Sequence, residues 1–506
     1  MAPAQGPAWA GCLDLLLDRH VRAGHGAAPA LVEHGAYGRR GLSYGQVQGL
    51  SVAIAHDLAL SLAGSRTPRR IALVGAATLE TICYWLAAMR AGHLPLLVDP
   101  AQPADQLGRL WTAFDPELVL HDGRAGSPPG SAFRPVEAWL AGLAAAPPGP
   151  PTCAPVGRFA GAFDARPALV QASGAGAARP SLCVHAHRAF WDFERNVSRP
   201  LWQIRRDDRL LGTAGPCRAA GLRAVHVALA AGACAVLLPA WRETGEVLEA
   251  IAREAVSVLL ATPAQLHLML AGAHRRHDLS TLGLTLCGGE RLPDLTRRNW
   301  QQLSGARVLD AIDSAETFGP YLSETRQGGP GMVRVPGYIH EQRRLAAAAG
   351  DGACTLWLSQ GNMMLGYMID GDSVRLDPPD VPFATGDVFA PAGAGLRFLS
   401  RENEGWTGDG HWLCPQALEE CLLADPGVGS AAAFVPAAGR RLHALVVPLP
   451  GWSGNKAELA AALMGRAALA PQALHPERIE IVPALPLRPD GAVRRQDLWT
   501  CRAAPD

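Results

Sequence analysis

Lysine is almost absent from this sequence. Of the 46 basic residues only one, Lys456, is a lysine, and the others are arginines. A bias toward GC-rich codons explains a general replacement of lysine by arginine, but it does not explain the loss of a lysine that catalysis requires. A reaction that uses a lysine in other proteins must therefore use Lys456 here, or it must proceed without a lysine side chain.

Other absences argue against whole classes of protein. The 46 basic residues are balanced by 46 acidic ones, so the basic excess typical of nucleic-acid-binding proteins is missing. The 11 cysteines form no CxxC pair and no cluster with histidine at zinc-binding spacing, and we expect reduced, mostly buried thiols. The most apolar stretch, residues 224–238, is too short to span a bilayer. No basic segment followed by an apolar run marks a signal peptide, so we expect a cytoplasmic protein without a membrane partner.

The length and the residue pattern predict an α/β protein with more than one domain. At about 150 residues per domain, 506 residues suggest two to four domains, and 48% hydrophobic residues allow a sizeable core. Short apolar runs typical of buried parallel strands alternate with helical patterns up to about residue 399. The expected strands are 70–75, 94–98, 118–121, 209–212, 234–238, 256–261 and 284–288. The expected helices are 79–90, 103–114, 219–231 and 247–254.

Two segments interrupt this alternation. Residues 141–160 are rich in Ala, Pro and Gly and predict a linker or surface excursion. The last hundred residues show short strand patterns at 431–435 and 442–447 and a helical pattern at 456–469, as in a small α+β domain. We therefore expect a large domain over residues 1–400, a hinge at 401–403 and a small domain over 404–506.

Four segments carry candidate site residues. Residues 170–187 contain a Gly/Ala/Ser loop whose backbone amides could hold a phosphate, although an ordinary turn is the simpler explanation. Residues 284–292 end a strand in two glycines, at the edge where α/β sheets bind ligands. Residues 383–387 place the carboxylate of Asp387 after Thr-Gly, where it could hold a ribose diol. Residues 483–498 form a Pro/Gly turn with several charged side chains.

The order and spacing of these segments resemble the adenylate-forming superfamily of acyl- and aryl-CoA synthetases, most closely its benzoate–CoA ligase branch. The resemblance extends over about residues 18–498. It implies a large N-terminal domain of stacked β-sheets and helices and a small α+β C-terminal domain. It also implies a reaction in which a carboxylic acid and ATP, with Mg²⁺, give an acyl adenylate and pyrophosphate. The acyl group then passes to CoA or to a carrier thiol.

The nucleoside end of the implied site is retained. The positions that match nucleotide-binding residues of the family are Ser173, Gly174, Gly289, Glu290, Asp310, Asp313, Asp387 and Arg401. Glu316 matches the glutamate to which the family gives a catalytic, Mg²⁺-binding role. The VPGY segment at 335–338 and the GY pair at 366–367 also match, whereas Asn403 replaces the hinge aspartate.

The phosphate end has lost its usual donors. Ser181 stands where the family has a lysine after the phosphate loop, and the loop itself reads AGAA in place of hydroxyl-bearing residues. Ala315 replaces a threonine, and Ala492 replaces the lysine that contacts the acyl-adenylate oxygens. Removing one preorganised donor of this kind typically costs about 10²–10³ in rate. We therefore expect the standard reaction to be slowed by several powers of ten.

Three arginines could substitute for the missing C-terminal lysine, namely Arg488, Arg494 and Arg495. A planar guanidinium at a different position does not, however, reproduce the compact charge of a lysine ammonium group. In the loop that delivers the thiol, Gly410 and Pro415 fit the family pattern and Thr407 replaces a frequent lysine.

The acid pocket also departs from the benzoate pattern. Ala220 and Gly319 stand where benzoate-type ligases have an aromatic residue and a histidine, which argues against a benzoate-sized aromatic acid. His185 and His187 flank the loop at 174–179, and we interpret them as structural residues at the end of a strand.

Three functions remain open at this point. The first is an active but diverged acid–thiol ligase. The second is a degenerate homologue that binds a nucleotide, an acyl ligand or a partner protein without adenylation. The third is an enzyme repurposed for another condensation or acyl transfer. The sequence predicts neither the acid, nor the acceptor, nor the oligomeric state.

Overall fold

The structure is a computed structural model that describes most of the chain. It covers residues 11–35, 38–62, 68–123, 130–145, 166–173, 180–239, 244–271, 277–329, 331–345, 352–368, 376–377, 382–408, 411–435, 442–449, 451–468, 474–486 and 493–500. Within these ranges no helix has the length and apolar character needed to cross a membrane. The cysteines that it describes are free and mostly buried, which confirms the prediction for them.

A mixed sheet of eight strands contains the first half of the predicted alternation. Its order is β19-β18-β8-β7-β4-β3-β5-β6. The strands are β3 (Arg70–Val74), β4 (Leu94–Val98), β5 (Leu118–His121), β6 (Ser131–Ala132), β7 (Pro167–Ser173), β8 (Ser181–Ala186), β18 (Gly366–Met368) and β19 (Leu376–Asp377). Strands β3 and β4 are buried along their whole length and pair in parallel, as expected for the continuous apolar runs RIALV and LPLLV.

A second sheet of nine strands carries the candidate site at its carboxyl edge. Its order is β15-β14-β13-β12-β11-β9-β10-β1-β2. The strands are β1 (Pro29–Gly35), β2 (Gly38–Ser43), β9 (Arg209–Gly212), β10 (Cys234–Leu237), β11 (Val258–Ala261), β12 (Leu284–Gly288), β13 (Arg307–Asp313), β14 (Pro320–Ser323) and β15 (Val333–Arg334). Because β12 and β13 are parallel neighbours, their carboxyl ends bring the segments after Gly288 and around Asp313 together.

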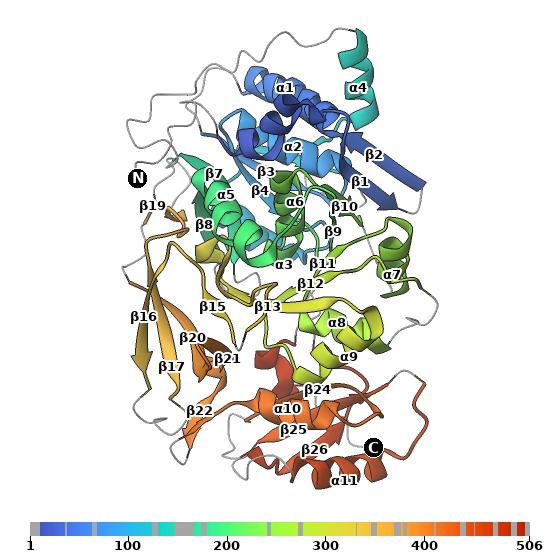
Figure 1. Ribbon diagram of the computed structural model, residues 1–506, viewed down its shortest axis with the longest axis vertical. Helices are drawn as coiled ribbons and strands as arrows, with labels where there is room; N and C mark the ends of the chain where they lie inside the picture. Colours follow the sequence, from blue (N-terminus) through green and yellow to red (C-terminus); the bar gives the residue numbers. More distant parts are fainter. Residues whose placement is uncertain are drawn as a thin grey trace.

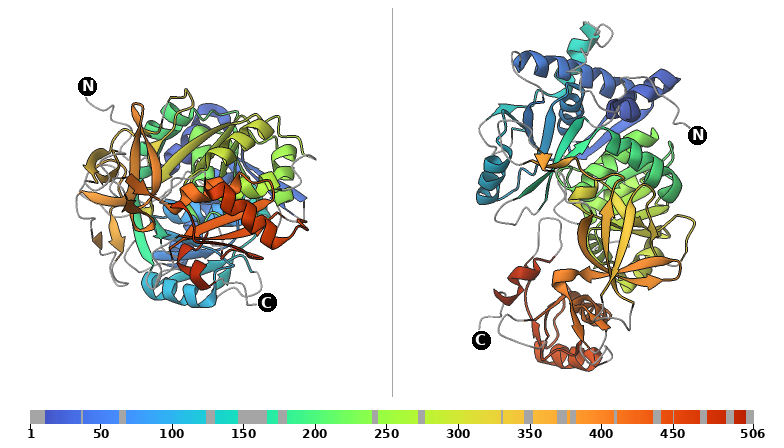
Figure 2. Two further views of the ribbon diagram at one scale, coloured as in Figure 1. Left: turned by 90° about the horizontal axis from the view of Figure 1, so that it is seen from below. Right: turned by 90° about the vertical axis from the view of Figure 1, so that its left-hand side faces the viewer.

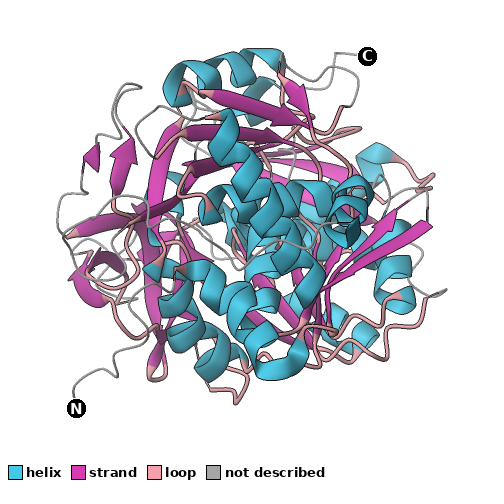
Figure 3. Ribbon diagram, turned by 90° about the horizontal axis from the view of Figure 1, so that it is seen from above, coloured by secondary structure: helices cyan, strands magenta, loops and turns pink. Residues whose placement is uncertain are grey.

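Two central helices join the sheets. Ten residues of α2 (Leu79–Arg90) and ten of α6 (Ala219–Ala231) are buried, as expected for helices that are apolar on most sides. One hydrophobic core contains both helices and strand residues from both sheets, and Figure 3 shows helices gathered at the centre of the molecule. The other helices of this region are α1 (Tyr44–Ser61), α3 (Ala104–Phe114), α4 (Val136–Ala145), α5 (Arg188–Phe193), α7 (Thr244–Arg253), α8 (Pro263–Ala271) and α9 (Asp294–Ser304). Shorter helical segments are η1 (Asp14–Asp18), η2 (Val21–His25), η3 (Glu194–Trp202) and η5 (Ala315–Thr317).

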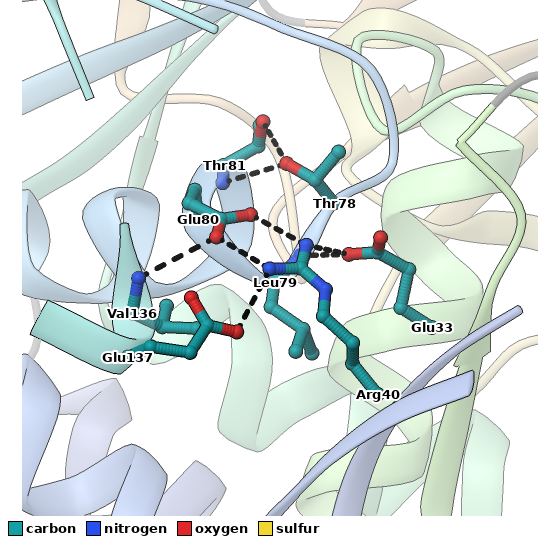
Figure 4. A network of polar contacts seen from close by, with 8 residues as sticks. All are labelled: Glu33, Arg40, Thr78, Leu79, Glu80, Thr81, Val136 and Glu137. Carbon is teal, nitrogen blue, oxygen red and sulfur yellow. Dashed lines mark hydrogen bonds and ion pairs between the residues drawn. The ribbon is translucent and has the colours of Figure 1, made fainter. Parts of the chain in front are cut away.

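An arginine fixes the β1–β2 hairpin against the start of α2. The Arg40 guanidinium lies 2.6 Å from Glu33, 2.8 Å from Glu80 and 3.1 Å from Glu137 (Figure 4). Glu33 also accepts a hydrogen bond from the Leu79 amide at the first turn of α2. This network orients the central helix relative to the edge of the nine-stranded sheet.

The chain after residue 338 is built from antiparallel strands and a small C-terminal unit. One sheet contains β16 (Ile339–Arg344), β17 (Cys354–Ser359), β20 (Phe383–Ala392) and β21 (Gly395–Arg401). The short helix η7 (Glu402–Glu404) and the pair β22 (Trp406–Gly408) and β23 (His411–Leu413) follow. The remaining elements are α10 (Pro415–Leu423), β24 (Val428–Phe434), β25 (His443–Pro448), α11 (Lys456–Ala467), β26 (Arg478–Ile481) and η9 (Arg495–Thr500). Elements from α10 onward lie together at one end of the molecule (Figures 1 and 2).

Most predicted elements are confirmed, and two predictions are wrong. Residues 141–145 belong to helix α4, because Trp139, Leu140 and Leu143 pack against the core and alanine favours helix. Residues 146–160 of that expected linker lie outside the described residues. The α/β alternation also ends earlier than residue 399, since the described residues of the segment 339–401 form antiparallel strands without helices: β16, β17, β20 and β21 make one sheet, and β18 and β19 join the eight-stranded sheet.

Candidate active site

A cavity of about 250 Å³ lies where the nine-stranded sheet, the β20–β21 hairpin and the C-terminal unit meet. It brings together three of the four candidate segments, which are far apart in the sequence. The lining residues used below are Ala264, Gly289, Glu290, Asp313, Asp387, Arg401 and Arg495. In Figure 1, helices α8 and α9 and strand β13 face the C-terminal unit from above.

Asp387 on β20 has a fully buried side chain at the wall of the cavity. The Tyr321 hydroxyl donates to its Oδ2 atom, and Arg401 Nε lies 3.1 Å from its Oδ1 atom. The Oδ1 atom is buried and accepts no hydrogen bond from the described residues. Burial raises the pKa of Asp387 to about 6, although Arg401 and Tyr321 oppose the shift. An unsatisfied buried carboxylate oxygen at a cavity wall suits a hydroxyl donor such as a ribose diol.

The turn after β12 forms another part of the wall. A side chain at Gly288 would lie 2.6 Å from the Ala311 carbonyl oxygen, so only glycine fits between the strands there. Gly289 has a φ of +91°, a conformation that favours glycine. The next residue, Glu290, accepts a hydrogen bond of 2.8 Å from the Ala264 amide at the start of α8. The two glycines therefore leave an open space beside a helix N-terminus that Glu290 holds in place.

The two aspartates of β13 have different surroundings. Asp310 is buried and does not line the cavity, and burial raises the pKa of its carboxyl to about 7. Its amide donates to Glu324, whose carboxylate is held by Arg297. Asp313, by contrast, lines the cavity and forms an ion pair with Arg223 of α6. The sequence pointed to both aspartates, but it did not reveal the arginine partner.

Glu316 lies on η5, directly after β13. The Tyr367 hydroxyl donates a 3.0 Å hydrogen bond to Glu316 Oε1, and the side chain is partly exposed. The carbonyl of Ala315 accepts a 2.8 Å hydrogen bond from His185 Nε2. Burial lowers the pKa of His185 to about 4, so the neutral ring holds this turn. His187 accepts a hydrogen bond from the Cys12 amide, and both histidines thus make the structural contacts expected of them.

The phosphate end is described only in part. Ser173 ends β7 and Ser181 begins β8, and the two residues are paired across the antiparallel ladder. Gly174 and the other loop residues up to 179 lie outside the described residues, as do Gly410, Arg488 and Ala492. Lys456 is exposed at the start of α11, which does not line the cavity.

Arg495 enters the cavity wall but is held by carboxylates. Its guanidinium makes two hydrogen bonds to Glu419, of 2.7 and 2.9 Å, and lies 3.8 Å from Glu404. It also donates to the Ala433 carbonyl. Arg494 is 3.8 Å from Asp497. Arg495 is thus near the expected place for a substitute cation, and much of its charge is already balanced.

The region of the predicted acid pocket is filled by aromatic rings. A side chain at Gly319 would lie 2.5 Å from the Phe193 ring. Phe193 and Phe318 both contact His226 of α6, at ring distances of 4.9 and 5.1 Å. Ala220 is half-buried in the first turn of the same helix. The two substitutions seen in the sequence therefore do not simply enlarge a pocket, because Phe193 takes up the space next to Gly319.

Comparison with known proteins agrees with this arrangement. The AMP-binding enzyme family matches residues 17–368, and the chain belongs to that family. A 4-hydroxybenzoate–CoA/benzoate–CoA ligase of Rhodopseudomonas palustris is 27% identical over 83% of this chain and 80% of its own length. An anthranilate–CoA ligase of Pseudomonas aeruginosa is 23% identical over 82% of this chain and 84% of its own length.

Solved structures show the same fold. An anthranilate CoA ligase in complex with anthranoyl-AMP has a TM-score of 0.83 at 18% identity, covering 99% of this chain and 98% of that protein. A benzoate CoA ligase from Burkholderia xenovorans LB400 has a TM-score of 0.79 at 20% identity, covering 97% and 99%. The fold expected from the sequence, stacked sheets and helices followed by a small α+β unit, is confirmed.

Proposed function

We propose that this protein is an acid–thiol ligase of the AMP-forming type with slowed adenylation. It activates an aryl or acyl carboxylic acid as an acyl adenylate and transfers the acyl group to CoA or a carrier thiol, in the cytoplasm. The observation that carries the proposal is that Gly289, Asp387 and Arg401, which match nucleotide-binding positions of the family, line one cavity. There Asp387, whose Oδ1 atom accepts no hydrogen bond from the described residues, would contact the ribose beside Arg401, and the turn at Gly289 would leave room for the base.

The residues assigned to ATP have distinct roles in this proposal. Asp387 accepts from the ribose hydroxyls, and Arg401 keeps that carboxylate ionised. Glu316 would hold Mg²⁺, which would neutralise negative charge on the phosphates of ATP. No group of three or more metal-binding side chains occurs among the described residues, and a single carboxylate with phosphates and water is an ordinary Mg²⁺ environment. Residues 401–403 act as a hinge between the regions 1–400 and 404–506.

Adenylation is slowed in this proposal because positive charge is missing at the phosphate end of the site. When the acid carboxylate attacks the α-phosphate, negative charge builds up on the phosphate oxygens and needs fixed donors. Ser181 and Ala492 offer no cation, Lys456 is on the outer helix α11, and Arg495 is committed to Glu419. Substrate binding is thus retained while the transition state loses stabilisation.

A second function is favoured by the same substitutions. A homologue that binds an adenine nucleotide, an acyl ligand or a partner protein without turning it over would tolerate Ser181, Ala315 and Ala492 without cost. Repurposed condensation or acyl transfer in the same cleft would tolerate them too. These functions differ from the proposal in one respect, which is whether pyrophosphate is released from ATP in the presence of an acid.

Pyrophosphate exchange with a panel of aryl and acyl acids, beside calorimetric titration with AMP, tests the proposal. We expect AMP to bind and at least one acid to support exchange several powers of ten below the rate of an ordinary ligase. AMP binding without any acid-dependent exchange would establish the non-catalytic alternative. Exchange at an ordinary rate would refute the part assigned to the missing lysines.

A further inference from the structure

A second cavity, of about 100 Å³, is lined by residues of helix α3, the start of α6 and the ends of strands β4 and β7. Its wall includes Ala172 and Pro180, which stand on the two sides of the segment 174–179. Ser181, where the family has a lysine, follows Pro180 directly. One water needs only about 10–15 Å³ of such space, so the cavity has room for a ligand of phosphate size.

Two arginines in this wall carry charge that is available to a ligand. Arg218 forms no ion pair with any carboxylate in the described part of the chain. Arg109 Nη2 donates 2.8 Å to Asp105 one turn earlier on α3, and the pair is partly exposed, so solvent screens it. Arg109 Nε has no hydrogen-bond partner among the described residues.

The rest of the wall adds little negative charge. Helix α6 begins at Ala219 in the wall, and a helix N-terminus carries a partial positive charge. Burial raises the pKa of the Cys217 thiol to about 12, so the thiol stays protonated at neutral pH. Asp99 is the one carboxylate among the lining residues, all of which are described, and its Oδ1 atom accepts from the Ala101 amide at 2.9 Å. The wall is therefore basic and suits an anion.

The cavity at Asp387 has the opposite charge balance. Six carboxylates and three arginines line it, so it disfavours the negative tail of ATP. Glu316 links the two regions in the fold. It follows Asp313 of the first cavity closely in the chain, and its partner Tyr367 pairs with Cys183 on β8, the strand that begins next to the second cavity.

We propose that the second cavity binds the pyrophosphate that adenylation releases, with Arg218 and Arg109 as its cationic contacts. When the acid oxygen bonds to the α-phosphorus, the bond from that phosphorus to the bridging oxygen breaks, and the electron pair leaves with pyrophosphate. The two guanidinium groups balance this charge. The inference rests on the proposed function, because it assigns the leaving-group end of the same ligase.

The two arginines compensate only in part for the lysine that Ser181 replaces. They lie on α3 and before α6, not on the loop itself, so they reach the leaving group rather than the α-phosphate. The α-phosphate, on which charge builds up in the transition state, still lacks its lysines. Adenylation is therefore possible but slow.

Calorimetric titration with inorganic pyrophosphate tests the inference without depending on turnover. We expect Arg218→Gln to weaken pyrophosphate binding at least about tenfold and Arg109→Gln at least about threefold, because each removes charged hydrogen bonds. The affinity for adenosine should stay within about twofold, since its contacts lie in the other cavity. In the exchange assay, Arg218→Gln should raise the pyrophosphate concentration required for half-maximal rate.

Matched variants separate lost charge from altered structure. Asp105→Asn breaks the same ion pair as Arg109→Gln but keeps the arginine, so it should not weaken pyrophosphate binding. Arg253 pairs with Glu249 on α7 over the same spacing, at 2.8 Å, and lines neither cavity, so Arg253→Gln should have no effect. Arg218→Lys keeps the charge and should retain most of the affinity. CoA, another ligand with phosphates, should lose less affinity than pyrophosphate in Arg218→Gln.

No binding of pyrophosphate to the wild type, equal affinity in Arg218→Gln, or an equal loss in Arg253→Gln would each overturn the inference. So would a greater loss for CoA than for pyrophosphate. Pyrophosphate binding that depends on both arginines, without acid-dependent exchange, would leave the site intact and refute the proposed function. Exchange that is insensitive to both arginines would do the reverse.

Discussion

The ribose-binding role proposed for Asp387 predicts that adenosine binding depends on pH. Burial raises the pKa of this carboxyl from 3.8 to about 6, and the ionised form accepts hydrogen bonds from the ribose hydroxyls more strongly than the protonated form. Adenosine is the informative ligand, because it lacks the phosphate of AMP, which itself titrates near pH 6. One pH unit below the pKa about a tenth of the carboxyl is ionised, so the dissociation constant should rise about tenfold between pH 7.5 and pH 5.

The variant Asp387→Asn isolates this effect. Loss of a hydrogen bond to a charged group costs about 1.5–3 kcal/mol, or roughly 10- to 150-fold in affinity at pH 7.5. Calorimetric titration at pH 5, 6, 7 and 7.5 should show a sloping profile for the wild type and a flat one for Asp387→Asn. A flat wild-type profile, or an equal slope in the variant, would refute the assignment of Asp387 as the ribose acceptor.

The same pKa shift predicts a stability change of defined sign. The folded pKa lies above the unfolded value, so the contribution of Asp387 is stabilising at low pH and is lost as the pH rises from about 4 to 6. A shift of about two units corresponds to about 3 kcal/mol. Relative to the wild type, Asp387→Asn should therefore gain about 2–3 kcal/mol of unfolding free energy between pH 4 and pH 8, measured by urea titration. A relative loss with rising pH would contradict the burial argument.

Three further predictions concern neighbouring groups. Gly319→Ala should destabilise the protein by about 1–3 kcal/mol in thermal or urea unfolding, because its Cβ would lie 2.5 Å from Phe193, whereas Gly465→Ala on α11 meets no such contact and should not. Glu419→Gln should lower the free energy of unfolding by about 1–3 kcal/mol. It should also speed hydrogen exchange at the Ala433 amide, which donates to Glu419. Unchanged exchange would refute the role given to the contact between Glu419 and Arg495. Tyr367→Phe removes the hydrogen bond to Glu316, so it should change the Mg²⁺ concentration required for half-maximal pyrophosphate exchange about two- to tenfold, with the melting temperature unchanged. An unaltered Mg²⁺ requirement would contradict the assignment of Glu316 as the metal ligand.

Much of the fold follows from local patterns in the sequence. Strands β4 and β5 and helices α2 and α6 have the predicted bounds, because apolar runs between glycine or proline breaks fix strands and helical spacing of large apolar residues fixes helices. The antiparallel region after residue 338 was not predicted, since half-buried strands such as β16 carry few apolar residues. Helix α4 was missed because alanine-rich sequence is typical of both linkers and helices.

The site could be predicted only as far as its motifs extend. Glycine turns and the Thr-Gly-Asp segment identified Gly289 and Asp387, because these positions need special backbone geometry or a carboxylate. The partners Tyr321, Arg223 and Glu419 were missed because each lies far along the chain from the residue that it contacts. No local pattern indicates such pairings, and only the folded chain brings them together.

The central claim is that this ligase retains its nucleoside site and is slow because two cations are missing. Its most direct test is the pyrophosphate-exchange rate of the double variant Ser181→Lys/Ala492→Lys, measured with the best acid for the wild type. If the site is otherwise intact, restoring the lysines should raise the rate by at least about 10²-fold, while AMP affinity changes little. No gain in exchange, with AMP still bound, would show that the missing cations do not limit adenylation, and it would contradict the account.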